Sequence, residues 1–230
     1  MPGWPSTSGD RLSTLTDAVS ITGNRPDGRP LSELGCLEVD ELLRLALALT
    51  ARVAEEHVLD RCFGNLHPDR IAWNSETVTL RPAPMALPDD PQVASARYLA
   101  PEQATDPKVE PGLRTDVFQL GVILYEAATG VHPFADDSVQ RVLDNIVSYS
   151  PPPPGNLRRE LLLEWDGILA CCMHKDPRQR YASALDVEAQ LEELARQGGT
   201  RRKQLRPRWR RILLAAVILA AAAWLLGWLL

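Results

Sequence analysis

The sequence predicts a mainly α domain with a short β-hairpin, followed by one C-terminal transmembrane helix. Three observations predict this class: several segments carry apolar residues at helical spacing, residues 116–129 are apolar almost all round, and residues 212–230 carry no charge. The chain has 230 residues, of which 45% are hydrophobic and 24% charged. This length allows one ordinary domain with a core of its own, and this composition excludes a disordered or collagen-like chain.

The first third of the chain predicts one long helix and one hairpin. Residues 1–27 are rich in Pro, Gly, Ser and Thr and predict a weakly structured lead without a cleaved signal peptide. Residues 38–56 carry apolar side chains on one helical face and charged side chains on the other, which predicts an amphipathic helix. Short extended runs within residues 63–81 predict a small hairpin, and the proline-rich continuation predicts a loop.

The remaining segments predict a helical core. Residues 116–129 predict a helix enclosed by other elements, and Gly130 suits its C-terminal end. No internal repeat is visible in the sequence. Residues 137–147 predict an amphipathic helix, and the proline run SPPPPGN (150–156) predicts an interruption of regular structure. Residues 161–173 predict an apolar helix. The capping-box pair Ser183 and Asp186 predicts the start of a last helix.

The four cysteines, Cys36, Cys62, Cys171 and Cys172, do not form a CxxC pair. In a reducing compartment they favour neither a disulfide framework nor a zinc site. We therefore expect them to be small buried hydrophobic side chains, and we expect no cofactor and no metal.

The last nineteen residues, 212–230, are long enough as a helix to cross a hydrocarbon core of about 30 Å. The alternative is a buried soluble helix, but such a helix is rarely apolar on every face over five turns. The preceding residues, 197–211, form a basic juxtamembrane linker, whereas residues 1–200 hold 18 basic and 30 acidic side chains. The expected membrane-interface residues are Arg201, Arg202, Lys203, Arg206, Arg208, Trp209, Arg210 and Arg211.

These basic residues set the expected orientation. By the positive-inside tendency, the linker and the N-terminus stay in the cytoplasm, so we expect a single-pass tail anchor in the cytoplasmic membrane. Membrane lipids are the expected partners of the apolar helix and the basic segment. A nucleic-acid patch is the alternative for the cations, but their position beside an apolar run favours lipid headgroups, so we expect no nucleic-acid partner.

Three motifs in order resemble the carboxyl-terminal lobe of bacterial Ser/Thr protein kinases of the eukaryotic type. They are RYLAPEQ (97–103), TDVFQLGVILYEAATGVHPF (115–134) and KDPRQRYASALDVEAQLEEL (175–194). The resemblance covers residues 28–196 and implies a kinase C-lobe-like domain there. It also implies structural roles: Glu102 pairs with Arg180 in a partly buried salt bridge, and Asp116 accepts hydrogen bonds from the catalytic-loop backbone. A solvated surface charge is the alternative for each, which three motifs in register disfavour.

The catalytic positions depart from this family. Its catalytic loop reads approximately His-Arg-Asp-Leu-Lys-Pro-x-Asn, and FGNLHPDR (63–70) matches it at the leucine and the proline. In this register Asn65 replaces the aspartate that accepts the substrate proton, His67 replaces the lysine, and Arg70 replaces a magnesium-binding asparagine. Pro82 stands where the family has the metal-binding aspartate. The resemblance therefore implies a degenerate, pseudokinase-like site without catalytic residues.

The nucleotide-binding lobe has no visible counterpart. Only 37 residues precede the predicted helix at 38–56, and they contain no GxGxxG and no VAIK-like lysine. We expect a catalytically inactive, membrane-tethered pseudokinase that acts as a scaffold or regulator for a cytosolic or membrane protein. The alternative is half of a kinase-like enzyme that a partner chain completes, or an atypical nucleotide-dependent transferase, in which Asn65, His67 and Arg70 would be active residues.

Overall fold

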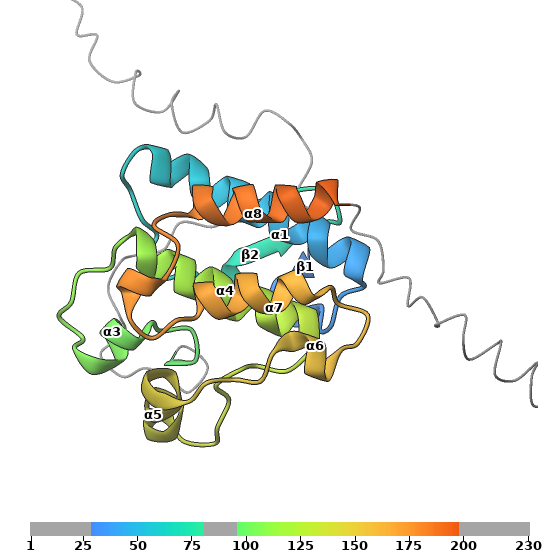
Figure 1. The fold of residues 1–230 in the computed structure, drawn as a ribbon. Helices are drawn as coiled ribbons and strands as arrows, with labels where there is room; N and C mark the ends of the chain where they lie inside the picture. Colours follow the sequence, from blue (N-terminus) through green and yellow to red (C-terminus); the bar gives the residue numbers. More distant parts are fainter. Residues whose placement is uncertain (1–28, 81–95, 198–230) are drawn as a thin grey trace, which may run out of the picture.

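The computed structural model describes residues 29–80 and 96–197, a helical domain that includes a small sheet (Figure 1). The expected lead 1–27, nearly all of the linker 197–211, the expected helix 212–230 and Pro82 lie outside the described residues. Among the described helices, none combines the length and the apolar character that crossing a membrane requires.

The first half of the domain combines a long helix with the sheet. Its elements are β1 (Arg29–Pro30), the 3₁₀ helix η2 (Leu31–Glu33), α1 (Val39–Val58), the 3₁₀ helix η3 (Pro68–Arg70), β2 (Ile71–Trp73) and β3 (Val78–Leu80). The strands lie in the order β1-β2-β3, and both pairs are antiparallel. The hairpin of β2 and β3 confirms the predicted one, and Asn74 Oδ1 closes its turn by accepting the backbone N–H groups of Glu76 and Thr77 at 3.0 and 2.7 Å.

The second half is helical. Its elements are α3 (Pro101–Thr105), α4 (Leu113–Thr129), α5 (Val139–Ser148), α6 (Pro154–Leu157), α7 (Leu163–Cys172), the 3₁₀ helix η4 (Pro177–Gln179) and α8 (Ala184–Arg196). The long predicted helices are present, with boundaries that differ by a few residues. The proline run does not simply break the chain, because α6 begins within it; proline is tolerated at the start of a helix, where its missing N–H has no partner to lose.

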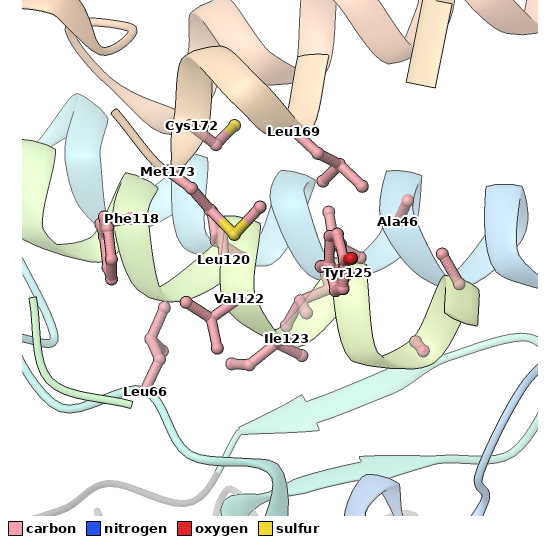
Figure 2. Close-up of a cluster of buried hydrophobic side chains, with 14 of the residues drawn as sticks. Ala46, Leu66, Phe118, Leu120, Val122, Ile123, Tyr125, Leu169, Cys172 and Met173 are labelled. Atoms are coloured by element: carbon pink, nitrogen blue, oxygen red, sulfur yellow. The ribbon is translucent and has the colours of Figure 1, made fainter. Parts of the chain in front are cut away.

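Helix α4 is the centre of the core, which explains why its sequence is apolar almost all round. Helices α1, α6, α7 and α8 contact it. Figure 2 shows Leu169, Cys172 and Met173 of the α7 segment against one side of α4, with α1 behind it. Gly130 ends α4 with a left-handed φ of 73°, which glycine adopts without steric cost.

Capping explains where the helices begin. Helix α4 starts three residues before the predicted Asp116, because Gly112 takes the N-cap position and donates its N–H to Thr115 Oγ1 at 3.1 Å. Helix α5 starts after Ser138, whose Oγ accepts the N–H of Arg141 at 3.2 Å. These local hydrogen bonds satisfy N–H groups that the first turn of a helix leaves free.

The cysteine expectation is wrong in part. All four thiols are free, and Cys172 is fully buried, but Cys36 is exposed and Cys62 and Cys171 are half-buried. Cys36 lies in the turn before α1, where its Sγ contacts the carbonyl oxygen of Ala128 at 3.4 Å instead of entering the core.

The close approach of α4 and α7 makes a first prediction. A Cβ on Gly121 would lie 2.7 Å from Cys172 Cβ and 2.9 Å from Met173 Cγ. We expect Gly121→Ala to lower the free energy of unfolding by about 1–3 kcal/mol through overpacking. Gly167→Ala is the matched control, since nothing lies within 4 Å of its Cβ; inside α7 it should stabilise by up to about 1 kcal/mol.

Urea unfolding of both variants, followed by circular dichroism, measures these changes. An unchanged or higher stability of Gly121→Ala would show that the two helices separate more easily than their packing indicates.

Candidate functional site

A buried aspartate holds the loop of residues 63–70, which the sequence resemblance aligned with a kinase catalytic loop. Asp116, on the first turns of α4, has no exposed surface. Its Oδ2 accepts the backbone N–H of Phe63 and its Oδ1 accepts that of Gly64, each at 2.7 Å. His57 Nε2 lies 3.0 Å from Oδ2. The Asp116 carboxylate thus contacts the backbone of the loop, as the sequence resemblance implied.

His57 connects this aspartate to the last helix. Its Nδ1 accepts the backbone N–H of Ala184, the first residue of α8, at 3.0 Å. A ring nitrogen that accepts a hydrogen bond carries no proton, so the proton lies on Nε2, which donates it to Asp116. His57 was not among the site residues predicted from the sequence. The only sign of its role is that it continues the apolar face of the predicted helix, one turn after Val53.

Two glutamines satisfy the next backbone groups of the loop. Gln119 Oε1 accepts the N–H of Leu66 at 2.8 Å, and its Nε2 donates to the carbonyl oxygen of Gly64 at 3.2 Å. Gln103 Nε2 donates to the same carbonyl oxygen at 2.9 Å. Both side chains are buried, and the sequence analysis did not single them out. The path of the loop is therefore fixed by buried groups on α3 and α4.

Gly64 stands at the position of the family's arginine in this register, and it has a left-handed φ of 66°. A Cβ here would lie 2.7 Å from Pro111 Cβ. Pro111 thus occupies the space into which a side chain would project.

The residues at the catalytic positions follow one another along this loop. Asn65 and Arg70 are half-buried. The Nδ1 of His67 accepts the backbone N–H of Asp69 at 3.2 Å and so caps η3, while its ring meets that of Tyr98 edge-on at 4.7 Å. Pro82, the fourth position, lies outside the described residues.

The rings of Tyr98 and His132 extend the packing that begins at His67. Tyr98 donates its hydroxyl to Glu126 Oε2 at 2.6 Å, and burial together with this carboxylate raises the pKa of the phenol. His132 meets the Tyr98 ring edge-on at 5.0 Å. Burial and the nearby Arg97 charge lower the pKa of His132 to about 3, so its ring is neutral at pH 7. This cluster supports the loop through packing.

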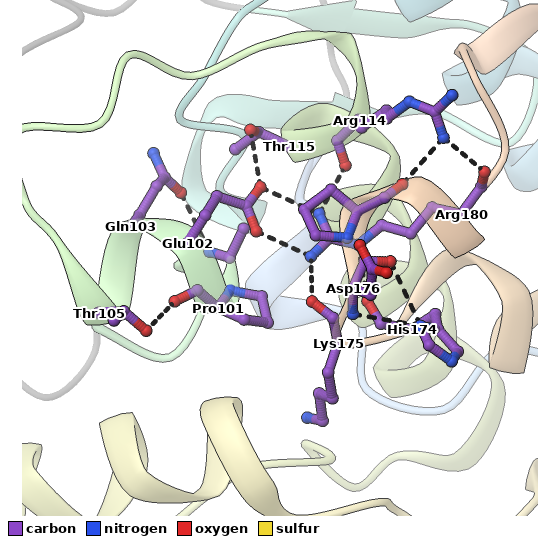
Figure 3. Close-up of polar contacts among 12 residues, drawn as sticks. Pro101, Glu102, Gln103, Thr105, Arg114, Thr115, His174, Lys175, Asp176 and Arg180 are labelled. Atoms are coloured by element: carbon purple, nitrogen blue, oxygen red, sulfur yellow. Dashed lines mark hydrogen bonds and ion pairs between the residues drawn. The ribbon is translucent and has the colours of Figure 1, made fainter.

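The predicted pair of Glu102 and Arg180 is an ion pair that joins α3 to the loop before α8 (Figure 3). Arg180 donates to Glu102 Oε1 at 3.0 Å and to Oε2 at 2.8 Å, and its side chain is fully buried. It also donates to the carbonyl oxygens of Arg114 and His174 at 2.9 and 2.7 Å. Thr115 Oγ1 donates to Glu102 at 2.9 Å.

These contacts determine the charge of Glu102. Burial by itself would raise the pKa of its carboxyl, but the hydrogen bond and the charge of Arg180 outweigh burial and lower it. The pair is therefore ionised at neutral pH, and its stabilising effect is lost as the pH falls through the lowered pKa of Glu102.

The loop presents little of the chemistry of phosphoryl transfer. Residues 63–70 contain one acidic side chain, Asp69, which stands outside the catalytic positions of the register, and the catalytic positions among the described residues supply an amide, an imidazole and a guanidinium. Within the described residues, no group of three or more His, Cys, Asp or Glu side chains is placed to hold a metal ion. Phosphoryl transfer in kinases depends on a positioned base and metal ligands.

Comparison with known proteins finds similarity to bacterial serine/threonine-protein kinases over less than half of the chain. The chain is 35% identical over 99 residues to the serine/threonine-protein kinase PknB of Mycobacterium leprae, a match that covers 43% of this chain and 16% of that protein. It is 36% identical over 99 residues to PknB of Mycobacterium tuberculosis strain H37Rv. A probable serine/threonine-protein kinase of Clostridium perfringens is 34% identical over 102 residues, which is 15% of its length.

No protein-family model matches the chain. The relatives nevertheless support a bacterial kinase-like region, and the helical fold with its small antiparallel sheet fits a kinase C-lobe. The matches span only about a sixth of the length of these relatives.

The ion pair makes the second prediction. Arg180→Ala should lower the free energy of unfolding by about 3–5 kcal/mol, because it leaves Glu102 partly buried without its partner and removes the bonds to three carbonyl oxygens. Glu102→Ala should cost less, since Arg180 keeps those carbonyl partners. The double variant should lose less than the two single losses added together, by about 1–3 kcal/mol.

Arg178→Ala is the matched control, because that side chain lies in the same loop but is exposed. It should change stability by less than about 0.5 kcal/mol. Strictly additive losses in the Glu102 and Arg180 variants would mean that the two side chains do not stabilise each other.

Proposed function

We propose that the chain is a catalytically inactive, membrane-tethered pseudokinase that acts as a protein-binding scaffold or regulator at the cytoplasmic membrane. One observation carries this proposal: the loop that corresponds to the catalytic loop is held by Asp116, but Asn65 stands at the position of the catalytic base. An amide cannot accept the proton of a substrate hydroxyl at neutral pH.

The hydrogen bonds that hold the loop support a binding role for the domain. Asp116, Gln119 and Gln103 all bind backbone atoms of the loop, so they preserve its shape whatever side chains it carries. Arg180 and Glu102 likewise fix the segment around α3. A domain that keeps its shape while losing reactive groups fits a role in which the surface recognises a cytosolic or membrane protein. The proposed chain needs no cofactor for that role.

The sequence supports the membrane part of the proposal. Residues 212–230 are uncharged and long enough to span, and seven cations precede them within residues 201–211. The lipid bilayer is thus the second proposed partner, reached through the apolar helix and the basic segment.

The proposed inactivity is tested on the purified full chain in detergent. With radiolabelled ATP and either magnesium or manganese, we expect no transfer to the chain itself or to a generic protein substrate. Asn65→Ala should behave like the wild type. Asn65→Asp should also stay inactive, because His67 and Arg70 still occupy the lysine and metal-ligand positions.

Metal-dependent autophosphorylation that Asn65→Ala abolishes would overturn the proposed inactivity. Transfer that starts only when a co-purified protein is added, and that Asn65→Ala again abolishes, would instead favour an enzyme completed by a partner chain.

The proposed anchor is tested by fractionation of cells. The full chain should sediment with the membranes and resist extraction with high salt, whereas deletion of residues 212–230 should release it. The control replaces the seven basic residues of 201–211 by Gln. This variant should stay in the membrane fraction, but a smaller share of its chains should have the N-terminus in the cytoplasm.

An N-terminal tag should survive protease added outside the cytoplasmic membrane. A full chain that stays in the supernatant, or a tag that external protease removes from sealed cells, would refute the anchor or its orientation.

A further inference from the structure

A shallow apolar groove of about 540 Å³ runs between α1 and α8, which lie side by side in Figure 1. Its apolar lining comes from Leu47, Ala48 and Ala51 of α1 and from Ala195 of α8. These four side chains are only half-buried. The small alanines leave a furrow between the two helices, and its apolar surface would gain free energy from being covered.

The rim of the groove carries unneutralised negative charge. Glu188 and Glu192 of α8 line it, and within the described residues neither forms an ion pair. Burial and the neighbouring carboxylates of Glu192 and Glu55 raise the pKa of Glu188. By contrast, Arg196 at the end of the groove already pairs with Glu193 at 3.1 Å. The groove therefore suits a segment with several cations and an apolar side chain.

We propose that the basic segment of the same chain, residues 201–211, docks in this groove when no anionic lipid surface binds it, so that the groove and the membrane compete for the same cations. Its first three cations, Arg201, Arg202 and Lys203, pair with Glu192 and Glu188, and Leu205 covers the apolar floor. The segment RRKQLRPRWRR holds seven basic residues and no acid, so its charge complements the rim of the groove.

The position of the segment in the chain favours this occupant. Helix α8 ends at Arg196, which lines the groove. Glu192 lies about 6 Å back along the helix from this end. Residues 197–200 can span up to about 13 Å, and they include Gly198-Gly199, a pair typical of turns. The chain can thus reverse after α8 and return along the groove. Because the segment is covalently linked to α8, its effective concentration at the groove exceeds that of a separate binding partner.

This inference does not depend on the proposed pseudokinase function, since it uses only the groove and the charges. It is tested on the full chain in an uncharged detergent, by the rate at which trypsin cleaves within residues 201–211. Docking protects these sites. The double substitution Glu188→Gln with Glu192→Gln should raise the cleavage rate about fivefold, as expected for the loss of two partly exposed ion pairs.

Glu76→Gln with Glu110→Gln is the matched control. It removes the same charge from exposed positions outside the groove and should leave the cleavage rate unchanged. Circular dichroism shows whether each variant is folded. As a second measurement, Glu192→Arg should also raise the rate of cleavage after Arg208, a site that the substitutions leave unchanged, and the further change Arg202→Glu should restore protection there.

Equal cleavage rates in the wild type and both double variants would overturn the proposal. So would protection that arises only when phosphatidylglycerol vesicles are added, equally in the wild type and in the Glu188→Gln, Glu192→Gln variant, because the lipid surface would then hold the segment.

Discussion

The buried carboxylate of Asp116 is the interaction on which the rest of the domain depends. A charge without any exposed surface is costly unless hydrogen bonds compensate for the lost water, and Asp116 receives three, from Phe63, Gly64 and His57. Since His57 also accepts the first N–H of α8, one carboxylate connects α1, α4, α8 and the loop. Removing it would leave several buried donors without partners at once.

This arrangement holds the loop through its backbone. Asp116, Gln119 and Gln103 bind the backbone of the loop, which every amino acid provides. The side chains of Asn65 and His67 contribute nothing to those bonds. Substitution of Asn65 therefore leaves these hydrogen bonds in place, whereas substitution at the anchoring positions removes them. His67 differs from Asn65, because its Nδ1 also caps η3 and its ring packs against Tyr98.

The sequence predicted those elements whose signal is local. Periodicity and the Gly130 and Ser183 signals located the helices, and the apolar run of α4 located the core. It did not predict β1, which has two residues, or α6, which begins within a proline run. Nor did it identify His57, Gln103 and Gln119, because their roles depend on partners far away in the chain. The roles of Glu102, Asp116 and Arg180 were predicted from the family resemblance. Their spacing in the sequence alone does not indicate which groups they contact.

The left-handed Gly64 couples two positions that lie far apart in the sequence. Any side chain at position 64 would meet both an unfavourable backbone conformation and the ring of Pro111. A larger residue at position 64 therefore requires a smaller residue at position 111, or a shift of the segment that carries it. Neither position can vary freely while the other stays as it is, so the two residues constrain each other although 46 residues separate them.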